Sequence, residues 1–573
     1  MRLRRGGRRG APSGVGRTDG DEAAASEASS AASDERRLPA RRAVVGAQRL
    51  WASARRLLTG LPLPLLAGLG LLLIGSGGVL ISTVDEEQPA VERVGGNQPV
   101  NEGAVDETDL SANNSPSLAR NPGDSRVLAV ANRIDAPDFS CMLHVSRNAG
   151  RSWDLVKIPV PAGEEKCFAP DVAFGADGTL HVAFVTLEGN GNTPSAGWVS
   201  TLNDDGETLS EPRKALGPLS FQVRLTAHPS NPDRLYLTWL DVSDVALYSI
   251  VLPGNPIKAA RSDDGGRTWS AGSRVSNSRR QRVLAPQPAI GPEGELYVLY
   301  LDVKDDRLDY EGLHDGGGGK PYDGSWELVL GRSEDGGETW SESVVEDRIV
   351  PPERFISFIP PFPSLAVDDD GRLYAAFDGL SGGDRDVLLW TLDPGDSDWG
   401  DPVRVNDTPA DDETSQYLPK LSIAPDGRLD VLYYDRRADR ANDTLTETSL
   451  QASFDRGESF APRARLSERS FDSRVGFGSE RGLPDLGSRL GLLSNDSRAL
   501  AVWTDTRAGR PASGKQDISS GVVAVSGNDV RLGSGLRGAL RFGGFALGLI
   551  GLALVASTVM PRVRLLARSL RRS

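Results

Sequence analysis

A short pattern that joins an aromatic residue to acidic and basic side chains recurs along the sequence. It reads aromatic-x-Asp-x-(Arg, Lys or Ser) and stands at 239–243, 300–304, 433–437 and 503–507, with Asp378 in a comparable place. Carboxylate and guanidinium groups at such spacing can bind polar ligands or pair with each other. A catalytic residue is needed only once, so the repetition favours structural Asp–Arg pairs. The alternative is a ligand-binding rim, for which the candidates are Asp435, Arg437, Asp505 and Arg507.

Cofactor sites have little support in the sequence. The acidic turns at 368–371 and 411–413 could hold calcium through carboxylate oxygens. Neither has EF-hand spacing, so solvated turns are the favoured interpretation. The four histidines lack zinc-site spacing, and no Gly-x-Ser-x-Gly string, P-loop or dinucleotide fingerprint occurs. We therefore expect no metal site and no cofactor, with calcium as the alternative.

A second repeat, S-x-D-x-G-x-T-W, indicates which elements position these side chains. It is nearly perfect at 262–269 and 333–340, varied at 146–153 and 453–460, and weaker around 204 and 393. In such a turn the Asp carboxylate can accept backbone N–H bonds, and Gly supplies a positive φ. The predicted role is structural. The central residues are Asn148, Asp204, Asp264, Asp335, Asp393 and Asp455, spaced 56 to 71 residues apart.

Seven strand–turn–strand segments accompany these six copies of the S-x-D-x-G-x-T-W repeat, which are called boxes below. They start near residues 116, 170, 222, 288, 363, 419 and 485, and each joins two apolar strands through a turn. A period of about 60 residues fits one four-stranded propeller blade. The sequence predicts an all-β fold over residues 113–527: a β-propeller of seven four-stranded antiparallel blades, with six blades as the alternative.

The boxes resemble the bacterial neuraminidase repeat, so residues 113–525 are similar to the sialidase-like Asp-box (BNR) β-propeller superfamily. That resemblance implies a site on the face opposite the boxes. Sialidases of this kind use three arginines, a tyrosine nucleophile with a Glu partner, and an Asp acid/base. The family's early Arg-Ile-Pro signature is replaced here by Asn114-Ser115-Pro116, and no Glu partner stands out. By position alone the corresponding residues are Arg224, Arg437 and Arg507 for the arginines, with Tyr417 and Asp171 as catalytic candidates.

Three functions fit these observations. The favoured one is a noncatalytic surface propeller that binds a glycan or a protein, because the fold signal is strong and the sialidase signature is broken. An exo-α-sialidase or related glycoside hydrolase is the first alternative. A structural component of the cell envelope is the second. The boxes themselves do not discriminate, since one fold hosts many functions.

Two uncharged stretches predict transmembrane helices at residues 57–84 and 542–560. A cleaved signal peptide is the alternative for the first, and a buried helix for the second. Arginines precede the first stretch and follow the second, which places both termini in the cytoplasm and the propeller outside the cell membrane. Residues 1–56 form a disordered basic tail in this scheme, residues 561–573 a second basic tail, and residues 85–112 and 528–541 are linkers.

Charge and cysteine content complete the description. The chain carries −14 overall, but the two tails are basic and residues 57–560 carry −26, which disfavours nucleic acid as a partner. The two cysteines, Cys141 and Cys167, lie in the predicted exterior. Oxidising surroundings would permit a disulfide between them; two separate buried thiols are the alternative.

Overall fold

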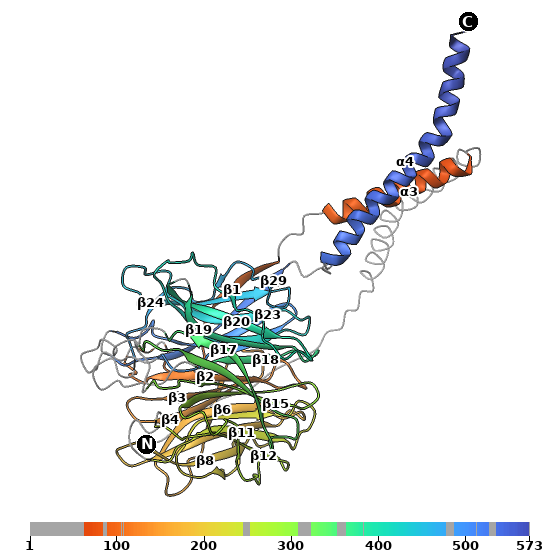
Figure 1. The fold of residues 1–573 in the computed structure, drawn as a ribbon. Coiled ribbons are helices and arrows are strands. Elements are labelled where there is room, and N and C mark those ends of the chain that lie inside the picture. Colours follow the sequence, from red (N-terminus) through yellow and green to blue (C-terminus); the bar gives the residue numbers. More distant parts are fainter. Residues whose placement is uncertain are drawn as a thin grey trace, which may run out of the picture. The chain divides into compact units, whose positions relative to one another are not determined.

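The computed structural model describes residues 62–83, 89–104, 106, 108–204, 206–244, 252–306, 322–351, 362–381, 383–476, 486–510, 513–526 and 534–571. It divides into two units, which are residues 87–528 and residues 1–86 together with 529–573. The larger unit is a seven-bladed β-propeller of antiparallel, four-stranded blades (Figure 1). The predicted fold and blade number are confirmed. The predicted disordered tail at 1–56 lies outside the described residues.

The first four blades follow one another in chain order. Their strands, from the axis outward, are β2 (Asn113–Arg120), β3 (Leu128–Ile134), β4 (Ser140–Ser146) and β5 (Asp154–Lys157); β6 (Lys166–Phe174), β7 (Leu180–Glu188), β8 (Thr193–Thr201) and β9 (Arg213–Leu216); β10 (Ser220–Ala227), β11 (Leu235–Asp241), β12 (Ile257–Ser262) and β13 (Ser273–Arg274); β14 (Val283–Ile290), β15 (Leu296–Asp302), β16 (Trp326–Ser333) and β17 (Ser341–Ile349).

The last three blades continue the pattern. Their strands are β18 (Ser364–Val367), β19 (Leu373–Ser381), β20 (Asp384–Leu392) and β21 (Val403–Arg404); β22 (Gln416–Ile423), β23 (Leu429–Asp435), β24 (Leu445–Ser453) and β25 (Ala464–Arg465), with β26 (Phe471–Asp472) also paired to β24; β27 (Gly491–Asn495), β28 (Arg498–Asp505), β29 (Asp517–Ser526) and β1 (Ala90–Pro99).

The second strand of each blade supplies much of the core. In β15 (LYVLYLD) all seven residues are buried, because both faces of the strand pack against neighbouring blades. Such strands are continuously apolar instead of alternating, as expected where both sheet faces are covered. Hydrophobic clusters therefore run from one blade into the next.

The ring is closed by strands from opposite ends of the propeller sequence. β1 pairs with β29 in antiparallel register from Ala90 opposite Ser526 to Pro99 opposite Ser519. In Figure 1 the red-brown β1 lies beside the blue β29. The prediction of a linker over residues 85–112 is therefore wrong for residues 90–99. Because β1 (AVERVGGNQP) is an outer strand whose side chains are mostly exposed, it lacks the apolar pattern that marks the other strands.

The box turns lie between the third and fourth strands of their blades. Asp264 Oδ1 accepts hydrogen bonds from the backbone nitrogens of Arg267 and Thr268, at 3.0 and 2.9 Å. Asn148, Asp335 and Asp455 bond their own turns in the same way. The weaker copy at Asp393 differs, because its carboxylate bonds Arg372 of the same blade.

The described residues of the smaller unit form the helices α3 (Leu63–Thr83) and α4 (Ser534–Leu570). They pack closely at two glycines, where a Cβ atom added to Gly68 would lie 2.9 Å from the carbonyl oxygen of Gly551. Among the described residues, one helical stretch, Phe542–Leu565, is long and apolar enough to cross a membrane, and Leu63–Ile74 is a shorter apolar stretch. The second span and the orientation of both termini stay predictions. α4 also includes part of the predicted linker 528–541 and most of the predicted tail 561–573.

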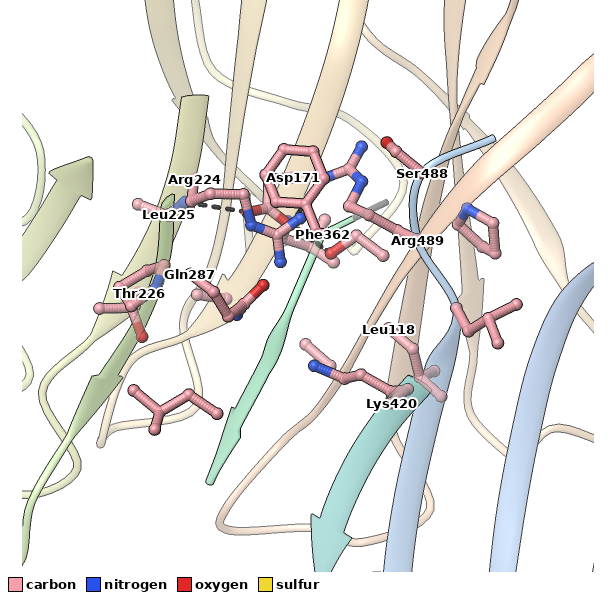
Figure 2. A pocket seen from close by; sticks show the side chains of 18 of the residues that line it. Leu118, Asp171, Arg224, Leu225, Thr226, Gln287, Phe362, Lys420, Ser488 and Arg489 are labelled. Carbon is pink, nitrogen blue, oxygen red and sulfur yellow. Dashed lines mark hydrogen bonds and ion pairs between the residues drawn. The ribbon is translucent and has the colours of Figure 1, made fainter. Parts of the chain in front are cut away.

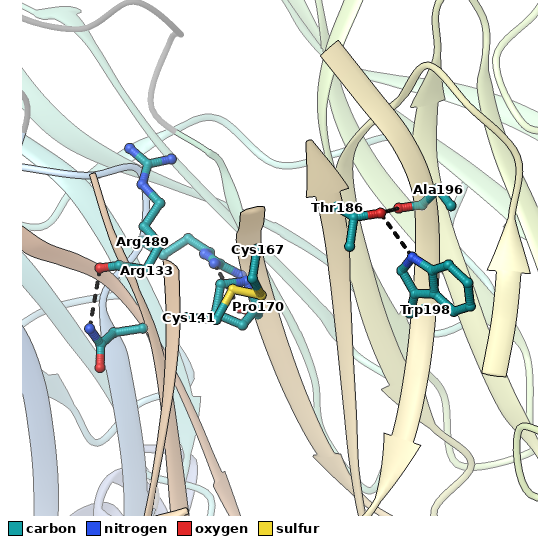
Figure 3. The surroundings of a disulfide bond; sticks show 9 residues. Arg133, Cys141, Cys167, Pro170, Thr186, Ala196, Trp198 and Arg489 are labelled. Carbon is teal, nitrogen blue, oxygen red and sulfur yellow. Dashed lines mark hydrogen bonds between the residues drawn. A yellow bond between two sulfur atoms is a disulfide. The ribbon is translucent and has the colours of Figure 1, made fainter. Parts of the chain in front are cut away.

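A disulfide bond joins Cys141 to Cys167, with Cα atoms 5.5 Å apart. Figure 3 shows it between the start of β4 in the first blade and the start of β6 in the second. Two neighbouring blades are thus linked covalently near the ends of these strands.

Candidate functional site

A repeated backbone irregularity positions the side chains nearest the propeller axis. Five of the described inner strands carry a bulge at the same place, and in each a residue within the bulge has a φ between 49° and 58°. These residues are Ser115, Ala169, Gln222, Ala285 and Leu418. A bulge re-aims the side chains that follow it. The residue two positions further on lines the axial cavity in each case: Ser117, Asp171, Arg224, Gln287 and Lys420.

The axial cavity has a volume of about 320 Å³ and is lined by residues of all seven blades. Figure 2 shows its side chains converging from several inner strands. Among the described lining residues, the charged ones are Asp171, Arg224, Lys420 and Arg489. Three cations thus share one carboxylate, which gives the described lining a formal charge of +2.

Asp171 is the centre of the hydrogen-bond network in this cavity. Its Oδ1 accepts a hydrogen bond from the Ser117 hydroxyl, and its Oδ2 accepts one from the backbone nitrogen of Leu225 at 2.9 Å. The Arg224 Nε and Arg489 Nη1 atoms lie 3.3 and 3.5 Å from its oxygens. Burial alone would raise the pKa of Asp171, but the two arginines and these hydrogen bonds outweigh it and lower the pKa. Asp171 is therefore an ionised, fully bonded group.

The two arginines are buried, each with about 8% of its surface exposed. Arg489 Nη2 donates to the carbonyl oxygen of Pro170 at 3.0 Å. Arg224 packs against the ring of Phe362, 5.8 Å from its centroid. Its Nη1 atom is buried and has no hydrogen-bond partner among the residues that the structure describes. Burial, followed by the charge of Arg224, lowers the pKa of Arg489 to about 9. The site therefore holds excess positive charge and an unused donor.

Lys420 is the third cation of the cavity. It follows the bulge in β22, and its side chain extends across the cavity in Figure 2. Burial, followed by the charge of Arg224 and against the opposing charge of Asp171, lowers the pKa of Lys420 to about 8. A substantial fraction of its amine is thus neutral near pH 8.

An arginine and two aromatic rings lie next to the cavity, beside the disulfide. Arg133 Nε donates to Asn114 Oδ1 at 2.7 Å and lies 3.0 Å from Asp135, and its guanidinium stands 4.9 Å from the ring centroid of Phe168. Phe168 in turn contacts Phe139 edge-on, with centroids 5.5 Å apart. Figure 3 shows Arg133 and Arg489 near the Cys141–Cys167 bond and Pro170.

Of the residues predicted from the sequence, Asp171 and Arg224 meet in the cavity, while Arg437 and Arg507 do not line it. Arg437 Nε bonds Asp435 at 2.7 Å, and its Nη1 lies 2.6 Å from Asp407. Arg507 pairs with Asp505 at 2.5 Å, and with Glu468 at 3.4 Å. The arginine triad predicted by position is therefore not formed. Because each of these arginines stands two residues after its aspartate, its side chain folds back onto that carboxylate.

Tyr417 also lies outside the axial cavity lining. It is buried, and its ring stands between the guanidinium groups of Arg385 and Arg436, 5.1 and 5.0 Å from their Cζ atoms. Its hydroxyl lies 3.5 Å from Thr446 Oγ1, and its ring contacts that of Tyr434. The described contacts of the tyrosine are thus with buried side chains of the blades, and it does not share the cavity lining with Asp171.

The sequence reasoning missed Lys420 and Arg489. Lys420 follows Pro419 directly, just as Asp171 follows Pro170 and Ser117 follows Pro116. Aligning the five hairpins that carry this proline would have placed Lys420 in the ring. Arg489 has no such marker, because its strand lacks the proline.

The acidic turns considered for calcium are engaged by arginines. Arg456 Nη2 lies 3.1 Å from Asp368 and 2.8 Å from Asp370, and Arg440 lies 3.5 Å from Asp412. No group of three or more His, Cys, Asp or Glu suited to a metal occurs among the described residues.

No protein-family model matches the sequence, and a comparison with curated proteins finds no match. Solved structures similar to the chain include the Hadza microbial sialidase Hz136 (14% identity, 74% of this chain and 67% of that one, TM-score 0.39). An α-L-arabinanase from Penicillium chrysogenum is similar at 16% identity over 65% of this chain and 97% of that one, with TM-score 0.37. The phage phi92 endosialidase shows 8% identity over 78% and 70%, with TM-score 0.40.

Proposed function

We propose that the chain is a membrane-associated propeller that binds an acidic group of a glycan in its axial cavity without cleaving the glycan. The supporting observation is the excess of cations: Arg224, Arg489 and Lys420 share the single carboxylate of Asp171 in the described lining. An entering carboxylate would reduce the excess charge and accept a hydrogen bond from Arg224 Nη1, the buried donor without a described partner.

A sugar is the preferred carrier of that acidic group. The cavity volume of about 320 Å³ is at the lower end for small-molecule sites and suits one terminal unit of a chain. Phe362 offers an apolar ring, and Ser488 and Gln287 offer polar atoms for hydroxyl groups. A carboxylate-bearing sugar would use both kinds of contact.

The chemistry of the cavity argues for binding without hydrolysis. Glycosidases that use carboxyl groups need two of them, and one must carry a proton to the leaving group. Asp171 is the only carboxylate of the described lining, its pKa is lowered, and its oxygens already accept hydrogen bonds. Tyr417, the candidate nucleophile, lies elsewhere. A noncatalytic binding module is therefore favoured over an exo-α-sialidase or related glycoside hydrolase.

The membrane part of the proposal rests on the apolar stretch Phe542–Leu565 and on the arginines that follow the apolar run. Their positive charge supports a cytoplasmic C-terminus and, with it, a propeller outside the cell. The bond between Cys141 and Cys167 agrees with that side, because oxidising compartments preserve disulfides.

Calorimetric titration of the full-length chain in detergent micelles tests the binding. We expect an oligosaccharide that ends in a carboxylate-bearing sugar to bind more tightly than its neutral-ended counterpart. Arg489→Gln should weaken that binding by about tenfold or more, because a hydrogen bond to a charged group contributes about 1.5–3 kcal/mol.

Arg437→Gln is the matched control, since it removes the same charge from a residue outside the cavity and leaves Asp435 paired with Arg463 at 3.4 Å. An equal loss of affinity for the acidic sugar in Arg489→Gln and Arg437→Gln would contradict the proposal. So would an equal affinity of the wild-type chain for the acidic and the neutral sugar. Release of a monosaccharide by the wild-type chain would instead favour the hydrolase.

A further inference from the structure

Lys420 differs from the other two cations of the axial cavity in its partners. Arg224 and Arg489 both lie within 3.5 Å of an Asp171 oxygen. Lys420 has no ion pair or hydrogen bond from its amine to any described residue, although it lines the same cavity. An amine held among cations is stabilised in its neutral, nucleophilic form.

The charge balance of the cavity indicates an electrophile that turns the amine into an anion. With Lys420 protonated, the described charged side chains sum to +2. If the same nitrogen carried a carboxylate, the lining would hold two positive and two negative groups and would be neutral. The new carboxylate could also accept hydrogen bonds from the two arginines, because Arg224 Nη1 is buried without a described partner and Arg489 lies in the same lining. Carbon dioxide is the small electrophile that converts an amine into a carboxylate-bearing carbamate.

We propose that Lys420 is a carbamylation site, at which dissolved CO₂ reversibly forms a lysine carbamate. The lone pair of the neutral Nζ atom forms a bond to the carbon of CO₂ while one C=O π bond opens onto oxygen. The nitrogen then releases a proton to water, which leaves Lys420 Nζ–COO⁻. No electrons are gained or lost. This step takes the side-chain charge from 0 to −1; counted from the protonated lysine, which first loses a proton to water, two protons are released and the charge changes from +1 to −1.

The lowered pKa of Lys420, about 8, supports this reaction, because the neutral amine is available in mildly alkaline solution. The groups that face it are Arg224 on β10, Asp171 on β6 and Arg489 before β27. The two arginines favour the carbamate and Asp171 opposes it.

Carbon-13 NMR of the full-length chain in detergent micelles, in buffer containing ¹³C-bicarbonate and no glycan, tests the proposal. We expect a protein-bound carbamate carbonyl resonance that grows between pH 7 and pH 9. It should be lost in Lys420→Arg, which keeps the positive charge but has no free amine to react. Lys258→Arg is the control: Lys258 pairs with Asp241 at 2.7 Å and should not contribute.

Alkylation of the carbamate followed by peptide mass spectrometry locates the modified residue, which separates Lys420 from the N-terminal amine. The wild-type chain and Lys258→Arg should carry the label on the peptide that contains Lys420. An unchanged resonance in Lys420→Arg, a label only at other amines, or no carbamate in the wild-type chain at pH 9 would overturn the proposal.

A second measurement rests on the proposed glycan binding. The carbamate removes the excess positive charge, so CO₂ should weaken binding of an acidic sugar at pH 8 in the wild-type chain and leave Lys420→Arg unaffected. A carbamate without any glycan binding would refute the proposed function alone, and glycan binding without a carbamate would refute the modification alone.

Discussion

Asp171→Asn tests the idea that one carboxylate holds the axial cavity together. The change keeps the shape of the side chain and one acceptor oxygen but removes the negative charge that Arg224 and Arg489 share. Asp171 has 2% of its surface exposed, so both arginines would remain buried with weaker compensation. Removing one partner of a buried ion pair costs about 3–5 kcal/mol. We expect a loss of about 3 kcal/mol in the free energy of unfolding, at the low end because Asn retains one acceptor.

Urea unfolding of the full-length chain in detergent, followed by tryptophan fluorescence, measures this loss at pH 7. Asp124→Asn provides the control, because Asp124 pairs with Arg126 at the surface, where solvent screens an ion pair and its contribution to stability is small. The loss of unfolding free energy in Asp171→Asn should also depend on pH. The folded-state pKa of Asp171 is lowered, so its stabilisation is present above the unfolded-state pKa and is lost as pH falls through the folded-state pKa.

The difference between wild type and Asp171→Asn should therefore persist from pH 8 to about pH 5 and shrink only in more acidic solution. Added acetate should stabilise Asp171→Asn more than the wild type, because the lining of the variant carries one more net positive charge. A loss as small as that of Asp124→Asn, or no difference in the effect of acetate, would refute the assignment of Asp171 as the neutralising group.

Two further predictions concern stability outside the cavity. Replacing Cys141 and Cys167 together by Ser removes a bond that links residues 26 positions apart, and it should lower the free energy of unfolding by about 2–4 kcal/mol. The comparison is with the wild-type chain, measured with and without reductant. An equal stability of the reduced and the oxidised wild type would contradict this prediction. Burial raises the pKa of Asp517 to about 7, so its folded form resists ionisation and stability should fall as pH rises from about 4 to 7. The thermal midpoint of Asp517→Asn, measured relative to wild type, should therefore be more favourable to the variant at pH 8 than at pH 5. An equal difference at both pH values would count against a buried, titrating carboxyl.

The fold was largely predictable because its signals are local and repeated. Each hairpin carries its own apolar strands and turn, and the box turns bond their own backbone, so seven copies reinforce one interpretation. β1 was not predictable in this way. Its exposed outer position imposes no apolar pattern, and its partner β29 lies more than 400 residues away in the sequence.

The site was predictable only in part, for a different reason. Asp171 and Arg224 stand on inner strands, and the place of these strands, together with the bulge in each, brings both side chains to the axis. Arg437 and Arg507 stand just after the ends of their strands, and each forms an ion pair with the aspartate two residues earlier. An arginine at such a position can face a cavity only if no neighbouring carboxylate pairs with it. The spacing of residues along the sequence does not show whether such a pair forms.

The closure of the ring by β1 and β29 has a consequence for how the chain is made. Residues 90–99 leave the ribosome early, yet their partner strand at 517–526 is synthesised more than 400 residues later. Until then the seventh blade lacks its outer strand, and β1 has an unpaired edge that favours association with other chains. Ring closure therefore requires that the propeller sequence be synthesised as far as residue 526, and a chain truncated before residue 517 would lack the partner strand of β1.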